Sequence, residues 1–165
     1  MSPTTRIIES LSVMPQQFEA LYRLAPAGKL RWVPESWEGI PGERFCIAEQ
    51  ACHIRDIEID GYQVRIRRLI EEDHPELVSF DSYELARVRR YEQLDPEEAL
   101  RAFREARRGT LELLAQATAQ QLERRGTFGE YGSVSLRGLV HFLCSHDQQH
   151  LACLQWLLGK IYSLP

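Results

Sequence analysis

Hydrophobic residues recur three or four positions apart over much of the chain, which is the spacing of amphipathic helices. Between residues 4 and 24 this stripe includes Leu11 and Phe18. We predict a helix there, with a kink or a restart at Pro15, because proline has no N–H to donate to the preceding turn. The segment 25–42 is rich in proline and glycine and is predicted to be a loop.

The second predicted helix runs from about residue 43 to residue 72. This stretch has no proline and a single glycine, Gly61, so nothing in it breaks a helix strongly. The turn signal Asp73-His74-Pro75 ends it. Between residues 75 and 91 we expect a loop and then a short helix over residues 83–90.

Capping signals mark the start of the third predicted helix. Asp95 can accept hydrogen bonds from the first free N–H groups, and Pro96 suits the first helical position. Glu98 completes the pattern of a capping box. We expect this helix to continue to about residue 124, with a turn over residues 126–132.

The fourth predicted helix is capped by Ser133 or Ser135 and runs to about residue 158, where Gly159 is expected to stop it. No stretch alternates with a period of two for long enough to predict a strand. Four long amphipathic helices with connections of mixed length predict an all-α protein, a four-helix bundle.

Composition and charge fit one cytoplasmic domain that spans residues 1–165. Hydrophobic residues make up 44% of the chain and charged residues 27%, which is ordinary for a globular protein. The net charge of -4 argues against non-specific nucleic-acid binding, which needs a basic surface. We expect neither a signal peptide nor a membrane span. Four cysteines, interpreted as reduced thiols, form no C-x-x-C pair: Cys46, Cys52, Cys144 and Cys153.

Two histidines occupy the apolar stripe of the last predicted helix. Leucines precede and follow them at spacings of three and four, and His146 and His150 take two positions of the same stripe. Residues four apart lie within ~40° of each other on a helix that turns ~100° per residue. Both imidazoles can therefore face one metal ion.

A third ligand would have to come from another helix, and His53 is the candidate. It lies on a mostly apolar face of the second helix, shared with Cys46, Gln50, Ile57 and Val64. Three imidazoles from two helices would leave coordination positions open, as in catalytic rather than structural metal sites. The alternative is a metal-free bundle in which hydrogen bonds satisfy the histidines, although unpartnered imidazoles are costly to bury.

Residues near these histidines leave further alternatives open. Asp147 could orient a neighbouring group, or it could pair with an arginine of another helix. Cys153 could approach the site, although a small apolar filler is its simpler role. His74, next to Pro75, and His141, which lies off the stripe, are expected at the surface.

Three segments of the chain form an ordered set of motifs. They are Cys52-His53-Ile54-Arg55-Asp56-Ile57-Glu58, Phe103-Arg104-Glu105-Ala106-Arg107, and Gly132-Ser133-Val134-Ser135-Leu136 leading into His146-Asp147-Gln148-Gln149-His150-Leu151. The set resembles the DinB/YfiT-like superfamily, in particular its DinB_2 branch. The resemblance covers nearly the whole chain.

That resemblance implies a four-helix bundle with a long crossover connection. It also implies a metal ion, commonly zinc or nickel, which His53, His146 and His150 would hold here. Characterised relatives include metal-dependent transferases and isomerases that use low-molecular-weight thiols such as bacillithiol and mycothiol. A homodimer is plausible by the same resemblance. The chain departs from the family at Cys46, because relatives usually place a serine shortly before the second helix.

A metal ion on three histidines could activate water or hold a low-molecular-weight thiol as thiolate. We therefore expect a metal-dependent hydrolase or thiol S-transferase acting on a small electrophile, with no nucleic-acid or membrane partner. Arg107 is a candidate binder of a substrate carboxylate or phosphate; its alternative is an inter-helix salt bridge. The competing hypothesis is a non-enzymatic metal-stabilised helical dimer or small-ligand sensor. Imidazole ligands suit zinc, nickel, copper and iron alike.

Overall fold

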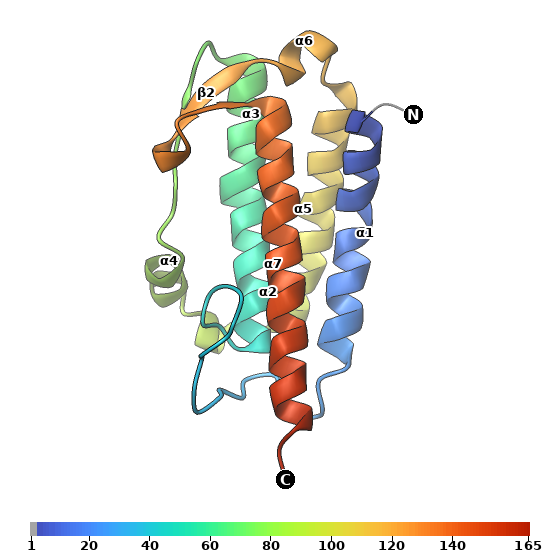
Figure 1. Ribbon diagram of the computed structural model, residues 1–165, viewed down its shortest axis with the longest axis vertical. Coiled ribbons are helices and arrows are strands. Elements are labelled where there is room, and N and C mark those ends of the chain that lie inside the picture. The colour runs from blue at the N-terminus through green and yellow to red at the C-terminus, as the bar shows by residue number, and fades with distance from the viewer. Residues whose placement is uncertain (1–2) are drawn as a thin grey trace.

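Four long helical segments form a bundle in the computed structural model, which describes residues 3–165 (Figure 1). Two of them run in one direction and two in the other (Figure 1). The segments are α1 (Pro3–Arg23), α2 (Ile47–Asp56) with its continuation through the π-helical η1 (Ile57–Tyr62) into α3 (Gln63–Glu71), α5 (Pro96–Gln116), and α7 (Leu136–Tyr162). No described helix is both long and apolar enough to cross a lipid bilayer.

The connection between α3 and α5 is the predicted long crossover. Both helices run upward in Figure 1, so the chain must return along the whole bundle between them (Figure 1). This connection contains β1 (Glu76–Leu77), α4 (Ser82–Arg89) and η2 (Tyr91–Gln93). α1 and α2 each pack against both α5 and α7. The expected all-α four-helix bundle with a crossover is therefore confirmed.

Three short strands were not expected from the sequence. β2 (Arg125–Phe128) pairs in parallel with β1 and antiparallel with β3 (Ser133–Ser135). The strands are too short to show an alternating pattern, and β1 lies far from β2 in the sequence. Their buried side chains, Leu77, Phe128 and Val134, cover one side of the bundle.

The ends of the second, third and last predicted helices differ from the prediction. The second helix begins at Ile47 instead of residue 43, with Cys46 as its N-cap residue and the Glu49 carboxylate accepting from the Cys46 N–H at 3.0 Å. The third helix ends at Gln116, and Thr118 caps a separate short helix, α6 (Ala119–Leu122). A capping box thus interrupts the expected continuation to residue 124.

The last helix passes through Gly159 and ends at Tyr162. A glycine inside a helix costs only about 1 kcal/mol relative to alanine. Leu158 and Ile161 are buried on either side of it, and burying such side chains stabilises the last turn by more than that cost. Tertiary packing therefore overrides the expected stop.

Pro15 does not restart α1, which is continuous from Pro3 to Arg23. The proline leaves the carbonyl of Leu11, four residues earlier, without its helical donor. Nη1 of Arg107 takes that place and donates to the Leu11 oxygen at 3.0 Å. A buried arginine from α5 thus compensates for the missing bond.

The π-helical segment η1 shifts the face that the second helix buries. A π-turn holds one residue more than an α-turn, so the residues beyond η1 are rotated relative to a regular helix. Val64, expected on the buried face, is 42% exposed. Arg65 and Ile66 are buried instead.

A polar layer divides the core into two apolar clusters. One cluster includes Phe18, Phe103 and Leu154, and the other includes Leu11 and Leu143. Buried polar residues from three of the four helical segments lie between them: Gln50, His53, Asp56, Glu58, Arg107, Thr110, Asp147 and His150. Because buried polar groups are costly unless they are satisfied, this layer is where function is expected.

Candidate metal centre

The three predicted histidines converge in the polar layer. His53 and His150 are fully buried, and His146 is half-buried. Nε2 of His146 lies 3.4 Å from Nε2 of His53 and 3.1 Å from Nε2 of His150. Tetrahedral bonds of about 2.0–2.1 Å place neighbouring ligand atoms about 3.3–3.4 Å apart. The spacing of the imidazole nitrogens therefore matches a mononuclear metal site.

Gln50 fixes the orientation of His150. Its side-chain oxygen lies 2.6 Å from Nδ1 of His150, and its amide nitrogen donates to the Glu43 and Phe45 carbonyls at 3.2 and 3.3 Å. The amide oxygen can only accept, so Nδ1 of His150 carries the hydrogen and Nε2 presents its lone pair to the other histidines. A hydrogen bond of this kind commonly orients a metal-bound histidine.

Burial keeps the histidines neutral. It lowers the pKa of His53, and it lowers the pKa values of His146 and His150 further, together with the charge of neighbouring histidines. Neutral imidazole is the form that binds a metal ion.

We expect Gln50→Leu to weaken zinc binding by about 10–100-fold, the usual effect of losing a residue that orients a metal ligand. Leucine has a similar volume but cannot accept the hydrogen of Nδ1, so His150 is free to rotate. Zinc affinity is measured by competition with a chromophoric chelator. Gln148→Leu, at an exposed position of α7, is the matched control. Equal affinities in the two variants would show that the amide does not position His150.

Glu43 completes the set of groups around the three nitrogens. Oε1 of its carboxylate lies 3.7 Å from Nε2 of His53, and Oε2 lies 3.7 Å from Nε2 of His150. Oε2 of Glu43 and Nδ1 of His53 are buried without a hydrogen-bond partner in the described part of the chain. Three neutral imidazoles and a carboxylate form a donor set that suits a divalent cation. The sequence did not identify Glu43, which was expected in the first turn of the second helix but lies in the loop before α2.

A cavity of about 250 Å³ adjoins His53, His146 and Glu43. Aromatic side chains from the second helix, the crossover, the sheet region and α7 form much of its wall, and Tyr62 lies 5.7 Å from the His146 ring between centroids. Its lining includes Tyr62, Arg65, Ser79, Phe80, Ser82, Phe128, Tyr131, Phe142, Ser145 and Gln149. A small molecule in this cavity would reach the histidines from one side.

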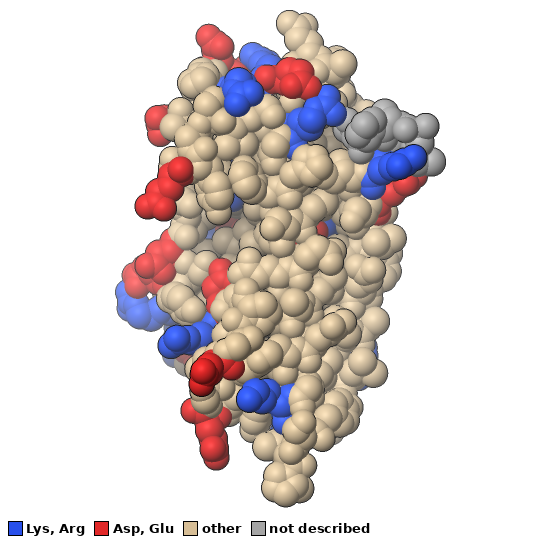
Figure 2. All heavy atoms as spheres, viewed as in Figure 1, with Lys and Arg blue, Asp and Glu red and all other residues tan. Residues whose placement is uncertain are grey.

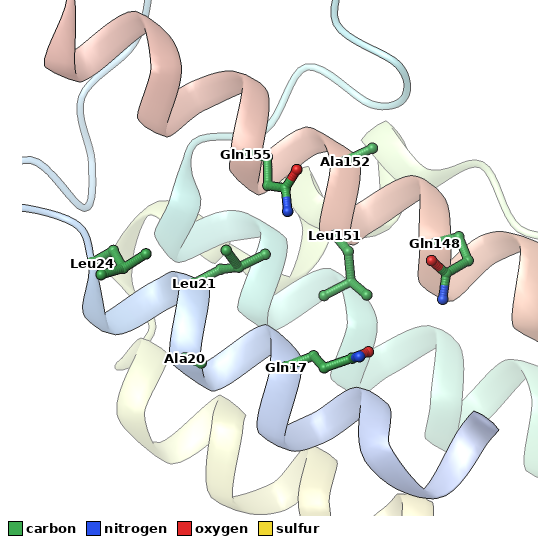
Figure 3. Close-up of a pocket in the computed structure, with 8 residues that line it drawn as sticks. All are labelled: Gln17, Ala20, Leu21, Leu24, Gln148, Leu151, Ala152 and Gln155. Atoms are coloured by element: carbon green, nitrogen blue, oxygen red, sulfur yellow. The ribbon is translucent and has the colours of Figure 1, made fainter. Parts of the chain in front are cut away.

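A second, larger cavity of about 560 Å³ lies in the groove between α1 and α7 (Figure 3). Glutamine, leucine and alanine side chains line it, and none of the lining residues described there is titratable. The surface over α1 and α7 is largely uncharged on this face (Figure 2). The groove therefore offers no acid, base or metal ligand for chemistry.

Arg107 is not placed to bind a substrate anion. It is buried, and Nε and Nη2 donate to the Glu58 carboxylate at 2.9 and 2.8 Å. Nη1 and Nη2 donate to the Asp147 carboxylate at 2.7 and 3.0 Å. With the bond to Leu11, all five N–H groups are used. Arg107 therefore forms the inter-helix salt bridge that the sequence analysis gave as its alternative role. Asp147 of α7 is one of its partners.

The remaining residues from the sequence analysis are not part of the histidine cluster. His74 and His141 are exposed, and Cys153 is a buried free thiol whose pKa burial raises to about 12. Asp56, buried in the same layer, accepts from the Tyr91 hydroxyl at 2.7 Å and pairs with Arg55. Cys153 lies beside Gln50 and Glu43, but the group of potential metal ligands found among the described residues contains only the three histidines.

Comparison with known proteins identifies a family and a similar fold. The family model of the DinB superfamily matches residues 10–154. Among solved structures, YfiT from Bacillus subtilis superimposes with a TM-score of 0.84 at 18% sequence identity, covering 98% of this chain and 90% of YfiT. YfiT is described as a probable metal-dependent hydrolase with an unusual four-helix bundle topology. No functionally curated protein matches the chain in sequence.

Proposed function

The chain belongs to the DinB superfamily, and we propose that it is a metal-dependent enzyme in which His53, His146 and His150 hold one divalent ion. Zinc and nickel are the metals that the resemblance to the family implies, since imidazole donors alone suit zinc, nickel, copper and iron alike. The observation that supports the proposal is the convergence of three neutral Nε2 atoms beside a small-molecule cavity. The description of YfiT as a metal-dependent hydrolase supports the same reaction class.

The bound metal would supply Lewis acidity, which brings a water or thiol toward its nucleophilic form near neutral pH. Glu43 is placed to take the proton, because its Oε2 has no partner and its Oε1 is held by the Ser82 hydroxyl at 3.3 Å. The oxygen or sulfur then forms a bond to the electrophilic carbon of the substrate. The leaving group departs with the electron pair of the broken bond and recovers the proton from Glu43.

Both nucleophiles fit this arrangement. Water gives a hydrolase, and a low-molecular-weight thiol gives an S-transferase acting on a small electrophile. Glu43 serves either one, since an O–H and an S–H both have to lose a proton. The cavity beside the histidines offers room for either nucleophile together with a small substrate.

We expect Glu43→Gln to lower kcat by about 10²–10⁴-fold, the contribution of a positioned general base. Zinc-loaded protein is assayed with p-nitrophenyl acetate for hydrolysis and with bacillithiol plus a halobimane for thiol transfer. Zinc content is measured on the same samples, so that a loss of proton transfer is separated from a loss of metal. The active substrate class identifies the nucleophile.

Glu49→Gln is the matched control, because the amide oxygen of glutamine can still accept the hydrogen bond from Cys46. It should retain wild-type turnover. Zinc-loaded protein that turns over neither substrate class, or full activity in Glu43→Gln, would contradict the proposal. A tightly bound metal without turnover would favour the alternative, a metal-stabilised sensor.

A further inference from the structure

Arg65 is a buried cation with no anionic partner among the described residues. It is 5% exposed and lies in the first turn of α3. Nε and Nη2 both donate to the backbone carbonyl of Val78, at 2.9 and 2.7 Å. Among the described residues no carboxylate pairs with it, and burial lowers its pKa. Its remaining N–H groups have no acceptor in that part of the chain.

Arg107 is a buried arginine that does have carboxylate partners, in contrast to Arg65. Both guanidinium groups are buried, but Arg107 is enclosed by two carboxylates. A buried charge without a counter-ion is strongly unfavourable, and proteins normally pair it. Folding therefore leaves Arg65 in a state that an anion entering from outside would stabilise.

Three aromatic rings hold the guanidinium of Arg65 in place. Its Cζ lies 5.2, 5.6 and 4.6 Å from the ring centroids of Tyr62, Phe80 and Phe128. Cation–π contacts of this kind compensate only part of the cost of burial. They do fix the direction of the N–H groups, which pre-organises a binding site.

The same side chain lines the cavity that reaches the histidines. The Tyr62 ring is in contact with both groups, because it lies 5.2 Å from Cζ of Arg65 and 5.7 Å from the His146 ring centroid. The guanidinium and the metal ligands are thus separated by about one aromatic ring. A cavity of about 250 Å³ limits the occupant to a small molecule.

The π-helical segment η1 is what brings Arg65 to this position. A regular helix would have turned Val64 inward, but the extra residue exposes Val64 and buries Arg65. Short π-helical segments inside α-helices are frequent at functional sites. Here the interruption replaces an apolar side chain with a cation in the wall of the cavity.

We propose that Arg65 binds a carboxylate of the substrate, so that the protein acts on small anionic molecules whose reactive bond lies near the histidines. The second half of this statement rests on the proposed function. The anion site itself does not, because the guanidinium and its aromatic surroundings are formed by the chain alone.

Binding of benzoate and of its neutral analogue benzamide tests the site. Both are measured by ligand-observed NMR on zinc-loaded protein. We expect wild type to bind benzoate at least about tenfold more tightly than benzamide, since charge-assisted hydrogen bonds are roughly twice as strong as neutral ones. Arg65→Gln should lose that preference. Arg67→Gln, at an exposed position of the same helix, should retain it.

The controls separate this inference from its alternatives. A preference that persists in Arg65→Gln but disappears in His150→Ala would place the carboxylate on the metal and overturn the proposal. Equal affinities of the wild type for benzoate and benzamide, or no binding of either probe, would also overturn it. Arg65 would then have only the structural role of donating to the Val78 carbonyl. A preference that survives in zinc-free His150→Ala and requires Arg65 would support the anion site even if the enzyme hypothesis fails.

A second readout covers the case in which Arg65→Gln does not fold. The Nε–H resonance of Arg65 in the ¹⁵N-labelled wild type, assigned with Arg65→Lys, should shift on addition of benzoate and stay unchanged with benzamide. An unchanged resonance at saturating benzoate would contradict the proposal.

Discussion

Replacing His150 with alanine is expected to weaken zinc binding by more than about 100-fold, because loss of a residue that merely orients a ligand already costs 10–100-fold. The substitution removes one of three converging nitrogens. It also leaves the buried Gln50 oxygen without its hydrogen-bond donor. His53→Ala and His146→Ala should weaken binding similarly. Competition with a chromophoric chelator measures all three.

His141→Ala is the control for these variants. His141 is on the same helix but exposed, so its removal should leave zinc affinity unchanged. If His150→Ala binds zinc as tightly as wild type, the three histidines are not the ligands. The metal-free alternative, in which they satisfy one another by hydrogen bonds, would then describe the centre.

Arg107→Met is expected to lower the free energy of unfolding by about 3–5 kcal/mol, the cost of breaking a buried ion pair on one side. Glu58 and Asp147 would remain in the core without their cation. The Leu11 carbonyl, to which Pro15 has no N–H to donate, would also lose its hydrogen-bond donor. Denaturant unfolding at neutral pH measures the change.

Arg108→Met should change stability by no more than about 0.5 kcal/mol, as is usual for surface positions. Its side chain is exposed and pairs with the neighbouring Glu105. Replacing Arg107, Glu58 and Asp147 together by apolar residues should recover part of the loss, because no unpaired charge then remains. A loss in Arg107→Met no greater than in Arg108→Met would show that the network does not stabilise the bundle.

Local signals in the sequence were sufficient for the framework of the fold and for the three histidines. Asp95 and Ser135 cap their helices as the sequence indicated, each through a side chain that accepts a backbone N–H. His146 and His150 were found because two polar residues interrupt an otherwise apolar stripe. Such patterns lie within one helix and are visible without tertiary information.

Features that depend on pairing between distant segments could not be predicted. Glu43 becomes part of the centre only when its loop folds over α2 and α7, and Arg107 acquires its carboxylates from two other helices. The sheet joins β1 to β2, which are separated in the sequence by α4, the whole of α5 and α6. Arg65 was missed for a different reason, because a regular period was assumed across η1.

The most direct test of the metal centre is zinc K-edge X-ray absorption on zinc-loaded protein, combined with elemental analysis. We predict about one zinc ion per chain, with three imidazole nitrogens at about 2.0–2.1 Å. Those imidazole signals should be lost in His150→Ala. Zinc that dissociates on dialysis, or zinc bound through sulfur without imidazole ligands, would contradict the account.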